Sequence, residues 1–424
     1  MIGAGSIVFA RRLLADMLSY PELAGSTVHL MDINQSRLEL IASLAETMVA
    51  QEGLPTRIEA TTNRTEALDG ADYVIAMIQV GGLDAFELDI AIPSRYGIDQ
   101  TVGDSLGPGG VFRGLRTIPV LVDVCHDMER YCPDALLINY ANPMAMNCWA
   151  MNSATEIRSV GLCHSVQGTA ERLAGFLGAP TSEVSYWAAG INHMSWFLRF
   201  EWKGKDAYPL LQKAMADPTV YVQEKVRWEI VRHFGYFVTE SSHHMSEYVP
   251  YFRKRPELIK NLVTPRWDYL QVCKNGWQQH YEEVRRQIAG DAPVEIGRSH
   301  EYGMEIINAM ETDVPARING NVANSGVVTN LPNGCCVEVP CLVDRTGIHP
   351  CHVGDLPPQC AALNRTNVNV QELAVKAALM GDRDAARMAV ALDPLTGALL
   401  TLDEISDMVG ELFAAEAAYL PQFV

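Results

Sequence analysis

The chain has 424 residues, of which 48% are apolar and 20% charged, a composition typical of a globular protein with a large core. This length predicts two or three domains, or one elaborate domain. Its 33 Lys and Arg residues against 51 Asp and Glu residues give a net charge of −18, which disfavours nucleic-acid and membrane partners. No apolar run reaches the ~18–20 residues that span a bilayer, and the first residues do not resemble a secretory signal. The ten cysteines form no CxxC pair. We therefore expect reduced thiols and a cytoplasmic protein.

The first third of the sequence alternates apolar strands with amphipathic helices. Helices are predicted at residues 9–19, 36–50 and 118–130, and strands at 27–32, 71–78, 135–140 and 159–163. Continuous apolar strands that alternate with helices indicate a parallel sheet covered on both faces. The sequence thus predicts a doubly wound α/β domain over residues 1–192, with ligands bound outside the carboxyl ends of its strands.

The pattern changes after about residue 193, where tryptophan, tyrosine and charged residues become frequent. Helices are predicted at residues 208–215 and 373–382, and a strand at 335–344. We interpret residues 193–424 as a second, mixed α/β (α+β) domain that contributes substrate, metal and oligomer contacts.

A short glycine motif begins the sequence. Gly3-Ala4-Gly5-Ser6 precedes a predicted helix, and Asp32 ends the next strand. Such a turn lets a pyrophosphate approach the helix N-terminus, while an acid at this position binds ribose hydroxyls and favours NAD over NADP. The third glycine of the motif is replaced by Val8 and only two residues precede Gly3, so a plain strand-to-helix turn is the alternative.

Two further segments have the composition of ligand-binding loops. The glycine-rich stretch Gly103–Gly110 contains Asp104 and leads to Arg113 and Arg116, which predicts a loop over cofactor or substrate, with a surface turn as the alternative. Asn142-Pro143 follows a predicted strand, where the amide could bind a substrate hydroxyl or the nicotinamide, and the X-Pro bond could be cis. A simple turn explains this dipeptide equally well.

Titratable residues cluster at three places. Cys163-His164 and Asn192-His193 each end a predicted strand, and a thiolate with an imidazole on one edge of a parallel sheet could bind a divalent metal. On spacing alone, a buried cysteine and a core histidine are commoner. The stretch Glu240–Tyr248, with His244, is either a solvated loop or an acid–base cluster.

Several of these motifs together resemble glycoside hydrolase family 4, the NAD- and manganese-dependent glycosidases. Within that family they are most similar to the bacterial α-galactosidases (melibiases). The resemblance extends over nearly the whole chain and rests on residues 3–6, 104–119, 139–151, 160–170, 189–194, 239–248 and 331–344.

The resemblance implies a lactate/malate-dehydrogenase-like Rossmann domain and an unusual hydrolysis of α-galactosides such as melibiose. NAD⁺ takes a hydride from C3 of the sugar, a base removes the C2 proton, the aglycone leaves by elimination, water adds and the hydride returns. The family is an exception to two-carboxylate glycosidases. The resemblance also leads us to expect a homo-oligomer, either a dimer or a tetramer.

The resemblance also implies roles for individual residues, which matching motifs assign as follows. Cys163 and His193 would bind Mn²⁺; Gly3, Gly5, Ser6, Asp32 and Gln79 would bind NAD; and Asn142, Arg113 and Arg116 would bind the sugar. Asp104 would tune the base, for which Tyr248 is the first choice and His244 the second. His164 stands where some relatives have an aspartate that protonates the leaving oxygen, and His300 stands where arginine is expected.

Three alternatives compete with an α-galactosidase. An α-glucuronidase or α-galacturonidase of the same family would use Arg113 or Arg116 for the sugar carboxylate. A metal-independent NAD-dependent 2-hydroxy-acid dehydrogenase would not need the Cys163/His193 pair. An NAD-sensing regulatory protein would have no activity at all. The sequence does not specify the aglycone.

Overall fold

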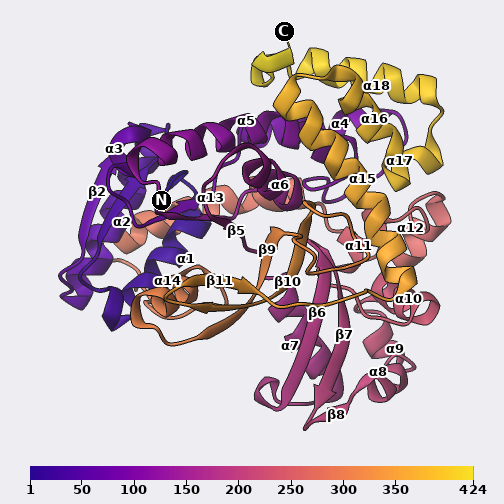
Figure 1. The fold of residues 1–424 in the computed structure, drawn as a ribbon, viewed down its shortest axis with the longest axis horizontal. Coiled ribbons are helices and arrows are strands. Elements are labelled where there is room, and N and C mark those ends of the chain that lie inside the picture. Colours follow the sequence, from indigo (N-terminus) through magenta and orange to yellow (C-terminus); the bar gives the residue numbers. More distant parts are fainter. Residues whose placement is uncertain (424) are drawn as a thin grey trace.

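The computed structural model describes residues 1–423 as an arrangement of helices around a long mixed sheet (Figure 1). The helices are α1 (Ile7–Leu18), α2 (Gln35–Glu52), α3 (Arg64–Leu68), α4 (Gly82–Arg95), α5 (Gly107–Tyr131), α6 (Met144–Ala154), α7 (Ser165–Leu177), α8 (Tyr208–Ala214), α9 (Pro218–Tyr221), α10 (Lys225–Phe234), α11 (Ser242–Tyr248), α12 (Pro256–Leu262), α13 (Tyr269–Ile288), α14 (Gly303–Thr312), α15 (Pro358–Met380), α16 (Arg383–Leu392), α17 (Pro394–Leu399) and α18 (Leu402–Ala415). The strands are β1 (Thr27–Met31), β2 (Arg57–Thr61), β3 (Tyr73–Ala76), β4 (Leu136–Asn139), β5 (Ser159–Gly161), β6 (Val184–Ile191), β7 (Met194–Trp202), β8 (Lys205–Asp206), β9 (Ala316–Ala323), β10 (Cys336–Asp344) and β11 (Gly347–Pro350).

Local sequence signals explain where several helices begin and end. The Asn34 side chain accepts a hydrogen bond from the Arg37 amide and begins α2, and Gly53, with φ +62°, ends it in the left-handed conformation that glycine tolerates. At α18, Thr401 and Glu404 form a reciprocal capping box. Helices α1 and α2 form close to the positions predicted from the sequence, whereas α5 begins at Gly107, well before the predicted start at residue 118.

The start of the chain completes a parallel sheet. Strand β1 pairs in parallel with β2, and β3, β4 and β5 pair in parallel with one another. Ile2 bridges Met31 of β1 and Ala76 of β3, both in parallel. Its amide donates to the Ile75 carbonyl at 2.7 Å, and the Gly3 amide donates to the Met31 carbonyl at 2.9 Å. Two residues before Gly3 are thus enough to occupy the position between β1 and β3, and the predicted Rossmann-type parallel sheet is confirmed.

The sheet continues into the second half of the chain, where its pairing becomes antiparallel. Strand β5 pairs with β9, β9 with β10, and β10 with β6. Strands β6 and β7 form a hairpin, and the expected domain boundary at residue 193 falls in its turn. One sheet therefore connects the parallel and mixed parts of the fold. Two successive antiparallel pairings give β10 the same direction as β5, and β6 is antiparallel to β10. The strand before Asn192 therefore runs opposite to the Rossmann strands, and the prediction that it is parallel to them is wrong.

Helix α5 is deeply buried over its first half. Its residues from Gly107 to Ile118 are all buried. Helix α15 packs against α5 and α6. The sequence predicted only the C-terminal part of α15, at residues 373–382.

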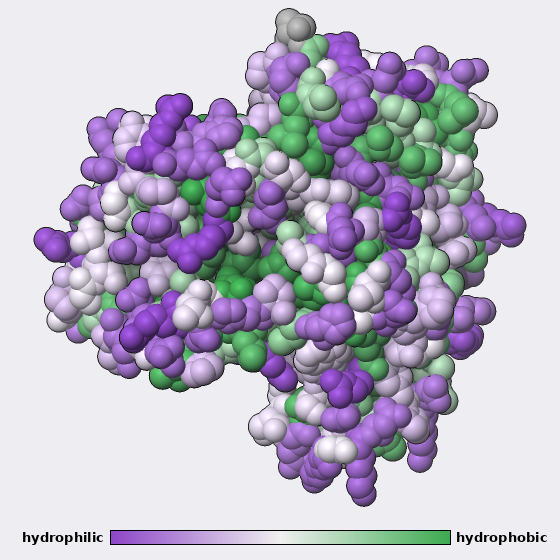
Figure 2. All heavy atoms as spheres, viewed as in Figure 1, coloured by the Kyte–Doolittle hydropathy of each residue, from purple (hydrophilic) through white to green (hydrophobic). Residues whose placement is uncertain are grey.

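Polar side chains cover most of the face in Figure 2, and apolar side chains gather in its central hollow and over the C-terminal helices. Within residues 1–423, no helix has the length and apolar character that crossing a membrane requires.

Candidate active site

The glycine turn at the N-terminus is shaped by close contacts. Gly3 has φ +83°, and a Cβ there would lie 3.0 Å from the Met77 backbone. A Cβ at Gly5 would lie 2.7 Å from Oδ2 of Asp32, to which the Gly5 amide donates a hydrogen bond of 2.8 Å. Ser6 is the N-cap of α1, and its side chain makes no capping hydrogen bond. The turn, the start of α1 and Asp32 therefore meet at one edge of the parallel sheet.

The surroundings of Asp32 fit a dinucleotide. Ile33, the next residue, is 90% exposed, which leaves an apolar surface beside the carboxylate where an adenine ring could pack. On the loop after β3, Gln79 donates to the Gly82 carbonyl at 3.0 Å, and that loop lies beside the turn because the Met77 amide bonds to the Ile2 carbonyl. The segments that carry Gly3, Gly5, Ser6, Asp32 and Gln79 are thus neighbours at one edge of the parallel sheet.

A row of paired residues across the sheet places Cys163 and His193 beyond the same edge of it. Gly161 pairs with Asn321, Asn321 with Glu338, and Glu338 with Gly190. Strands β5 and β6 run in opposite directions, but their carboxyl ends both reach this row. Cys163 follows Gly161 by two residues and His193 follows Gly190 by three.

His193 lies in a buried polar cluster. It has φ +61° and is 4% exposed. Its Nδ1 lies 3.2 Å from the Tyr248 hydroxyl and 3.4 Å from Ser105 Oγ, and its ring lies 4.7 Å from that of His244. Burial, followed by the charge of His244, lowers the pKa of His193 to about 4. The imidazole is therefore neutral, and Nε2 takes part in neither contact.

Cys163 is half-buried, and burial together with the carboxylates of Glu338 and Glu240 raises the pKa of its thiol. The donor set of one sulfur and one neutral imidazole nitrogen fits a divalent transition metal, which would itself hold the thiolate form. Among residues 1–423, no group of three or more His, Cys, Asp or Glu side chains is arranged to hold a metal. A bound ion would therefore need oxygen ligands from substrate or water in addition to Cys163 and His193.

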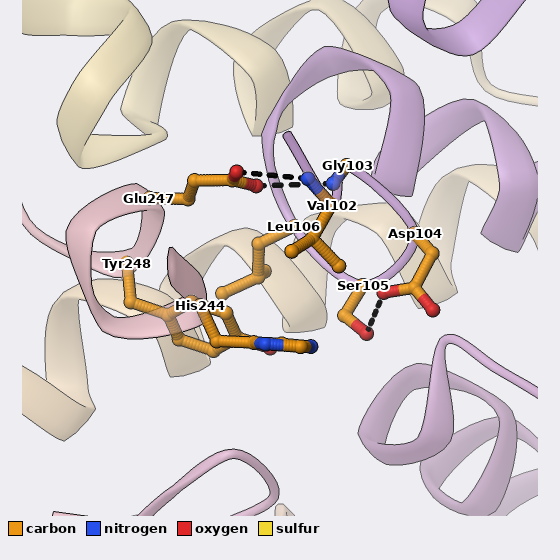
Figure 3. A pocket seen from close by; sticks show the side chains of 8 residues that line it. All are labelled: Val102, Gly103, Asp104, Ser105, Leu106, His244, Glu247 and Tyr248. Atoms are coloured by element: carbon orange, nitrogen blue, oxygen red, sulfur yellow. Dashed lines mark hydrogen bonds between the residues drawn. The ribbon is translucent and has the colours of Figure 1, made fainter. Parts of the chain in front are cut away.

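Asp104 and Asn142 are in direct contact. Asn142 Nδ2 donates to Asp104 Oδ2 at 2.9 Å, and Ser105 Oγ donates to Asp104 Oδ1 at 2.8 Å (Figure 3). Asp104 is 3% exposed, and the Asn142-Pro143 peptide is cis. The loop before α5 and the loop after β4 therefore meet, and Ser105 of the first loop reaches His193.

Helix α11 carries both residues considered as the base. The Ser241 hydroxyl accepts a hydrogen bond from the His244 amide and caps the helix. Tyr248 is 3% exposed, and burial and the Asp104 carboxylate raise its pKa well above the ordinary value. The predicted polar cluster at 240–248 is therefore largely a buried helix beside His193 rather than a solvated loop.

His244 is engaged by an acid on its own segment. Its Nδ1 lies 2.7 Å from Oε2 of Glu240, which has φ +75°. Burial opposes charge on both side chains, but the ion pair prevails, so the pKa of His244 is raised and that of Glu240 is lowered. Glu240 thus occupies Nδ1 of His244, and only Nε2 of that ring is left to exchange a proton with a ligand.

His164 stands at the start of α7 with its imidazole partly exposed. Its Nδ1 lies 3.6 Å from Oε1 of Glu301, a buried carboxylate that Arg12 approaches at 3.3 Å. The nearby Glu301 carboxylate raises the pKa of His164. His300, in contrast, is a surface residue paired with Glu171 at 3.1 Å.

The structure separates the two arginines of α5. Arg116 is completely buried, paired with Asp89 at 2.5 Å and Glu416 at 2.8 Å, and its Nε donates to the Val80 carbonyl. Its donors are occupied, so the expected substrate contact has no support in this structure. Arg113 is 7% exposed, and its Nε and Nη1 have no partner among the described residues. Its guanidinium lies 5.2 Å from the Phe86 ring centroid, with donors available to a ligand.

The glycine-rich segment before these arginines is only partly a loop. Leu106 is the N-cap of α5, and Gly107-Pro108-Gly109-Gly110 forms the first turn of the helix. A Cβ at Gly109 would collide with the Asp89 backbone, so glycine here allows α5 to pack closely against α4. The prediction that all of Gly103–Gly110 is a loop is therefore wrong from Gly107 onward.

Comparison with known proteins agrees with this geometry. Residues 1–179 match the family 4 glycosyl hydrolases, and residues 188–396 match the C-terminal domain of the same family. The chain belongs to glycosyl hydrolase family 4. It is 43% identical to a Bacillus subtilis protein named α-galactosidase, over 100% of this chain and 98% of that protein.

Solved structures of this family have the same fold. The crystal structure of the lplD protein of Bacillus subtilis has a TM-score of 0.88 and 27% identity, covering 97% of this chain and 98% of that chain. A 6-phospho-α-glucosidase from gut microorganisms, solved in complex with NAD and Mn²⁺, has a TM-score of 0.85 and 20% identity, covering 99% of this chain and 98% of that chain. This last likeness shows the shared fold alone.

Several acids of this family 4 protein were given no individual role by the sequence analysis. Glu338 lies in the row beneath Cys163 and His193, where it accepts a hydrogen bond from Ser195 Oγ at 2.6 Å, and burial raises its pKa to about 7. Its signal in the sequence is a charged residue within the apolar strand β10. The others, Glu240, Glu247 and Glu301, lie in polar segments, where nothing local distinguishes a buried acid from a solvated one.

Proposed function

We propose that this family 4 glycosyl hydrolase is an α-galactosidase that uses NAD⁺ and Mn²⁺. The observation that carries the proposal is the contact of His193 with Tyr248 and of Asn142 with Asp104, at the edge of the sheet beyond which Cys163 and the glycine turn also lie. Ordinary acetal hydrolysis by two carboxylates needs neither a dinucleotide turn nor a sulfur–nitrogen metal pair. The 43% identity to a protein named α-galactosidase supports the choice of sugar.

When bound, the cofactor would supply reversible hydride removal at C3 and the metal would supply Lewis acidity at the sugar oxygens. Cys163 and His193 would hold the metal, and Gly3, Gly5, Ser6, Asp32 and Gln79 would hold the dinucleotide. The Asn142 amide, fixed by Asp104, would orient a sugar hydroxyl. These side chains bind and orient rather than exchange protons.

Proton transfer falls to two residues on different elements. In its phenolate form, Tyr248 would take the C2 proton, and the nearby Asp104 carboxylate makes the phenolate oxygen more basic. His164, paired with Glu301, would hold the proton given to the leaving oxygen. Because the cofactor would supply hydride transfer reversibly, the overall reaction would be hydrolysis with no net oxidation.

The deciding experiment is hydrolysis of p-nitrophenyl α-galactoside by the purified protein, first dialysed against EDTA and freed of bound nucleotide. We expect activity when NAD⁺ and Mn²⁺ are both present with a reductant, and none when either is omitted. Full activity in the absence of either one would contradict the proposal.

The unpartnered guanidinium of Arg113 favours a second candidate, an α-galacturonidase or α-glucuronidase. A free, buried cation is the expected partner of a uronate carboxylate. Parallel assays with p-nitrophenyl α-galactoside, α-galacturonide and α-glucuronide distinguish the candidates by kcat/KM. A preference for either uronide would replace the galactosidase assignment.

A further inference from the structure

Glu247 is a buried carboxylate between His244 and Tyr248 on α11. It is 3% exposed. Figure 3 shows its side chain turned toward Val102 and Gly103, while His244 points toward Ser105. Glu247 therefore contacts the loop that leads to Asp104 and not the cluster around His193.

The loop wraps its backbone amides around this carboxylate. Oε1 accepts hydrogen bonds from the amides of Thr101 at 2.6 Å and Val102 at 2.9 Å, and Oε2 accepts one from the amide of Gly103 at 3.0 Å. The Thr101 hydroxyl adds a fourth at 3.0 Å. Consecutive amides that converge on an oxygen anion form a backbone nest, so a side chain of α11 fills the anion site of this loop.

Neighbouring side chains compensate the buried charge. Nη2 of Arg253 lies 3.4 Å from Glu247 Oε1 and donates to the Thr101 hydroxyl at 2.7 Å, and the Arg253 side chain is completely buried. Gln100 Nε2 donates to Oε2 of Glu247 at 3.2 Å. A buried carboxylate with this many partners holds its geometry firmly, and removing it would leave several donors unpaired.

The hydrogen bonds between Glu247 and the amides of Thr101, Val102 and Gly103, here called the clamp, affect two residues of the proposed chemistry. Glu247 immediately precedes Tyr248 and Gly103 immediately precedes Asp104, so the hydrogen bonds between Glu247 and the loop fix how these two functional residues face each other. We propose that Glu247 is a positioning residue that holds the Asp104 carboxylate opposite Tyr248 and thereby speeds removal of the C2 proton. The inference rests on the proposed function and adds a residue that does not touch the substrate.

The test is Glu247→Gln, which keeps the shape but turns an NH₂ group toward at least one loop amide. We expect kcat to fall by about 10- to 100-fold, the scale of a small displacement of reacting groups, with the KM values nearly unchanged. The kinetic isotope effect of C2-deuterated galactoside should grow, and that of C3-deuterated galactoside should not. The matched control is Glu404→Gln in the C-terminal helix α18. The Glu404 side chain also accepts a hydrogen bond from a backbone amide, that of Thr401, at 2.8 Å.

Two results would overturn the inference: a kcat of Glu247→Gln equal to that of the Glu404→Gln control, or a loss of kcat with an unchanged C2 isotope effect. Hydrogen exchange of the Thr101, Val102 and Gly103 amides keeps the clamp testable if the wild-type protein hydrolyses no galactoside. In that case the proposed function fails, but the clamp can still be tested. Amide exchange at least about tenfold faster in Glu247→Gln than in the control supports the clamp, and equal exchange in the two variants refutes the clamp.

Discussion

The Tyr248 hydroxyl lies 3.2 Å from Nδ1 of His193, which joins α11 to the turn of the β6–β7 hairpin. The contact links the residue proposed to take the C2 proton with a residue proposed to bind the metal. Because Nδ1 faces Tyr248 and Ser105, only Nε2 is left for an ion, and the ring orientation is set by these partners.

Metal removal tests the Cys163 and His193 pair. EDTA should abolish activity and Mn²⁺ should restore it, and Cys163→Ser should lose metal binding with its fold retained because serine does not supply a thiolate. Metal content and circular dichroism of the same sample separate the two effects. Cys351→Ser, another half-buried cysteine, is the control and should bind metal normally. Full metal-dependent activity in Cys163→Ser would reject the assignment.

Cofactor preference tests Asp32. Its carboxylate should accept the ribose hydroxyls of NAD⁺ and repel the extra phosphate of NADP⁺, so NAD⁺ should activate the wild-type protein better. Asp32→Ser should narrow the ratio of the two dissociation constants, although both cofactors bind less tightly once the bond to the Gly5 amide is lost. Fluorescence titration measures both constants, with the exposed Asp69→Asn as the charge control. An unchanged ratio would mean that Asp32 does not contact the ribose.

The two arginines of α5 should give opposite phenotypes. Arg116→Gln leaves Asp89 and Glu416 without their buried cation, so it should destabilise the protein by about 3–5 kcal/mol. Arg113→Gln removes donors that have no partner among the described residues, so the melting temperature of this variant should differ little from that of the wild type. Its kcat/KM for the sugar should fall about tenfold or more. Differential scanning calorimetry and initial rates measure the two effects. Equal loss of stability in both variants would contradict a substrate role for Arg113.

The pH dependence of stability tests Asp393, the N-cap of α17. Burial raises its pKa to about 6 despite hydrogen bonds from Thr396. The folded protein then binds a proton that the unfolded chain has already released, so stability falls as pH rises from about 4 to 6, by roughly 3 kcal/mol in total. Asp393→Asn should remove this fall and keep the cap, because asparagine is also a good N-cap.

The control for this measurement is Asp382→Asn, at the N-cap of α16. Hydrogen bonds from the Ala385 amide and Lys376 lower the pKa of Asp382, so its contribution is present above the unfolded pKa and is lost as pH falls. Melting temperatures of both variants relative to wild type, measured between about pH 4.5 and 7, should therefore show an upward trend with pH for Asp393→Asn and none for Asp382→Asn. A flat profile for Asp393→Asn would show that its carboxyl group titrates normally.

Much of the parallel half of the fold could be predicted from the sequence, because its strands are continuous apolar runs and its helices have local caps such as Asn34. Ile2 could not be recognised as part of the sheet, since a single bridging residue carries no periodic signal. The direction of β6 was also hidden, because its partner β10 lies far later in the chain and pairing at such a separation depends on the whole fold.

The candidate site was predictable where motifs end strands and unpredictable where burial decides. Cys163, Asn142 and Asp104 follow or precede regular elements, so their positions could be anticipated. Arg113 and Arg116 lie on one helix and have the same chemistry, and only the acids supplied by α4 and the C-terminal segment distinguish them. The role of Glu247 likewise depends on three loop amides that no local pattern reveals.

The most direct measurement of the central claim is hydrolysis of an α-galactoside in D₂O, followed by NMR of the released galactose. Removal of the C2 proton by Tyr248 predicts deuterium at C2, whereas two-carboxylate hydrolysis leaves that position untouched. Tyr248→Phe should slow the exchange by the ~10²–10⁴-fold expected for losing a general base. Galactose with deuterium at C2, formed only with NAD⁺ and Mn²⁺, is the predicted result, and galactose without deuterium at C2 would contradict the elimination mechanism.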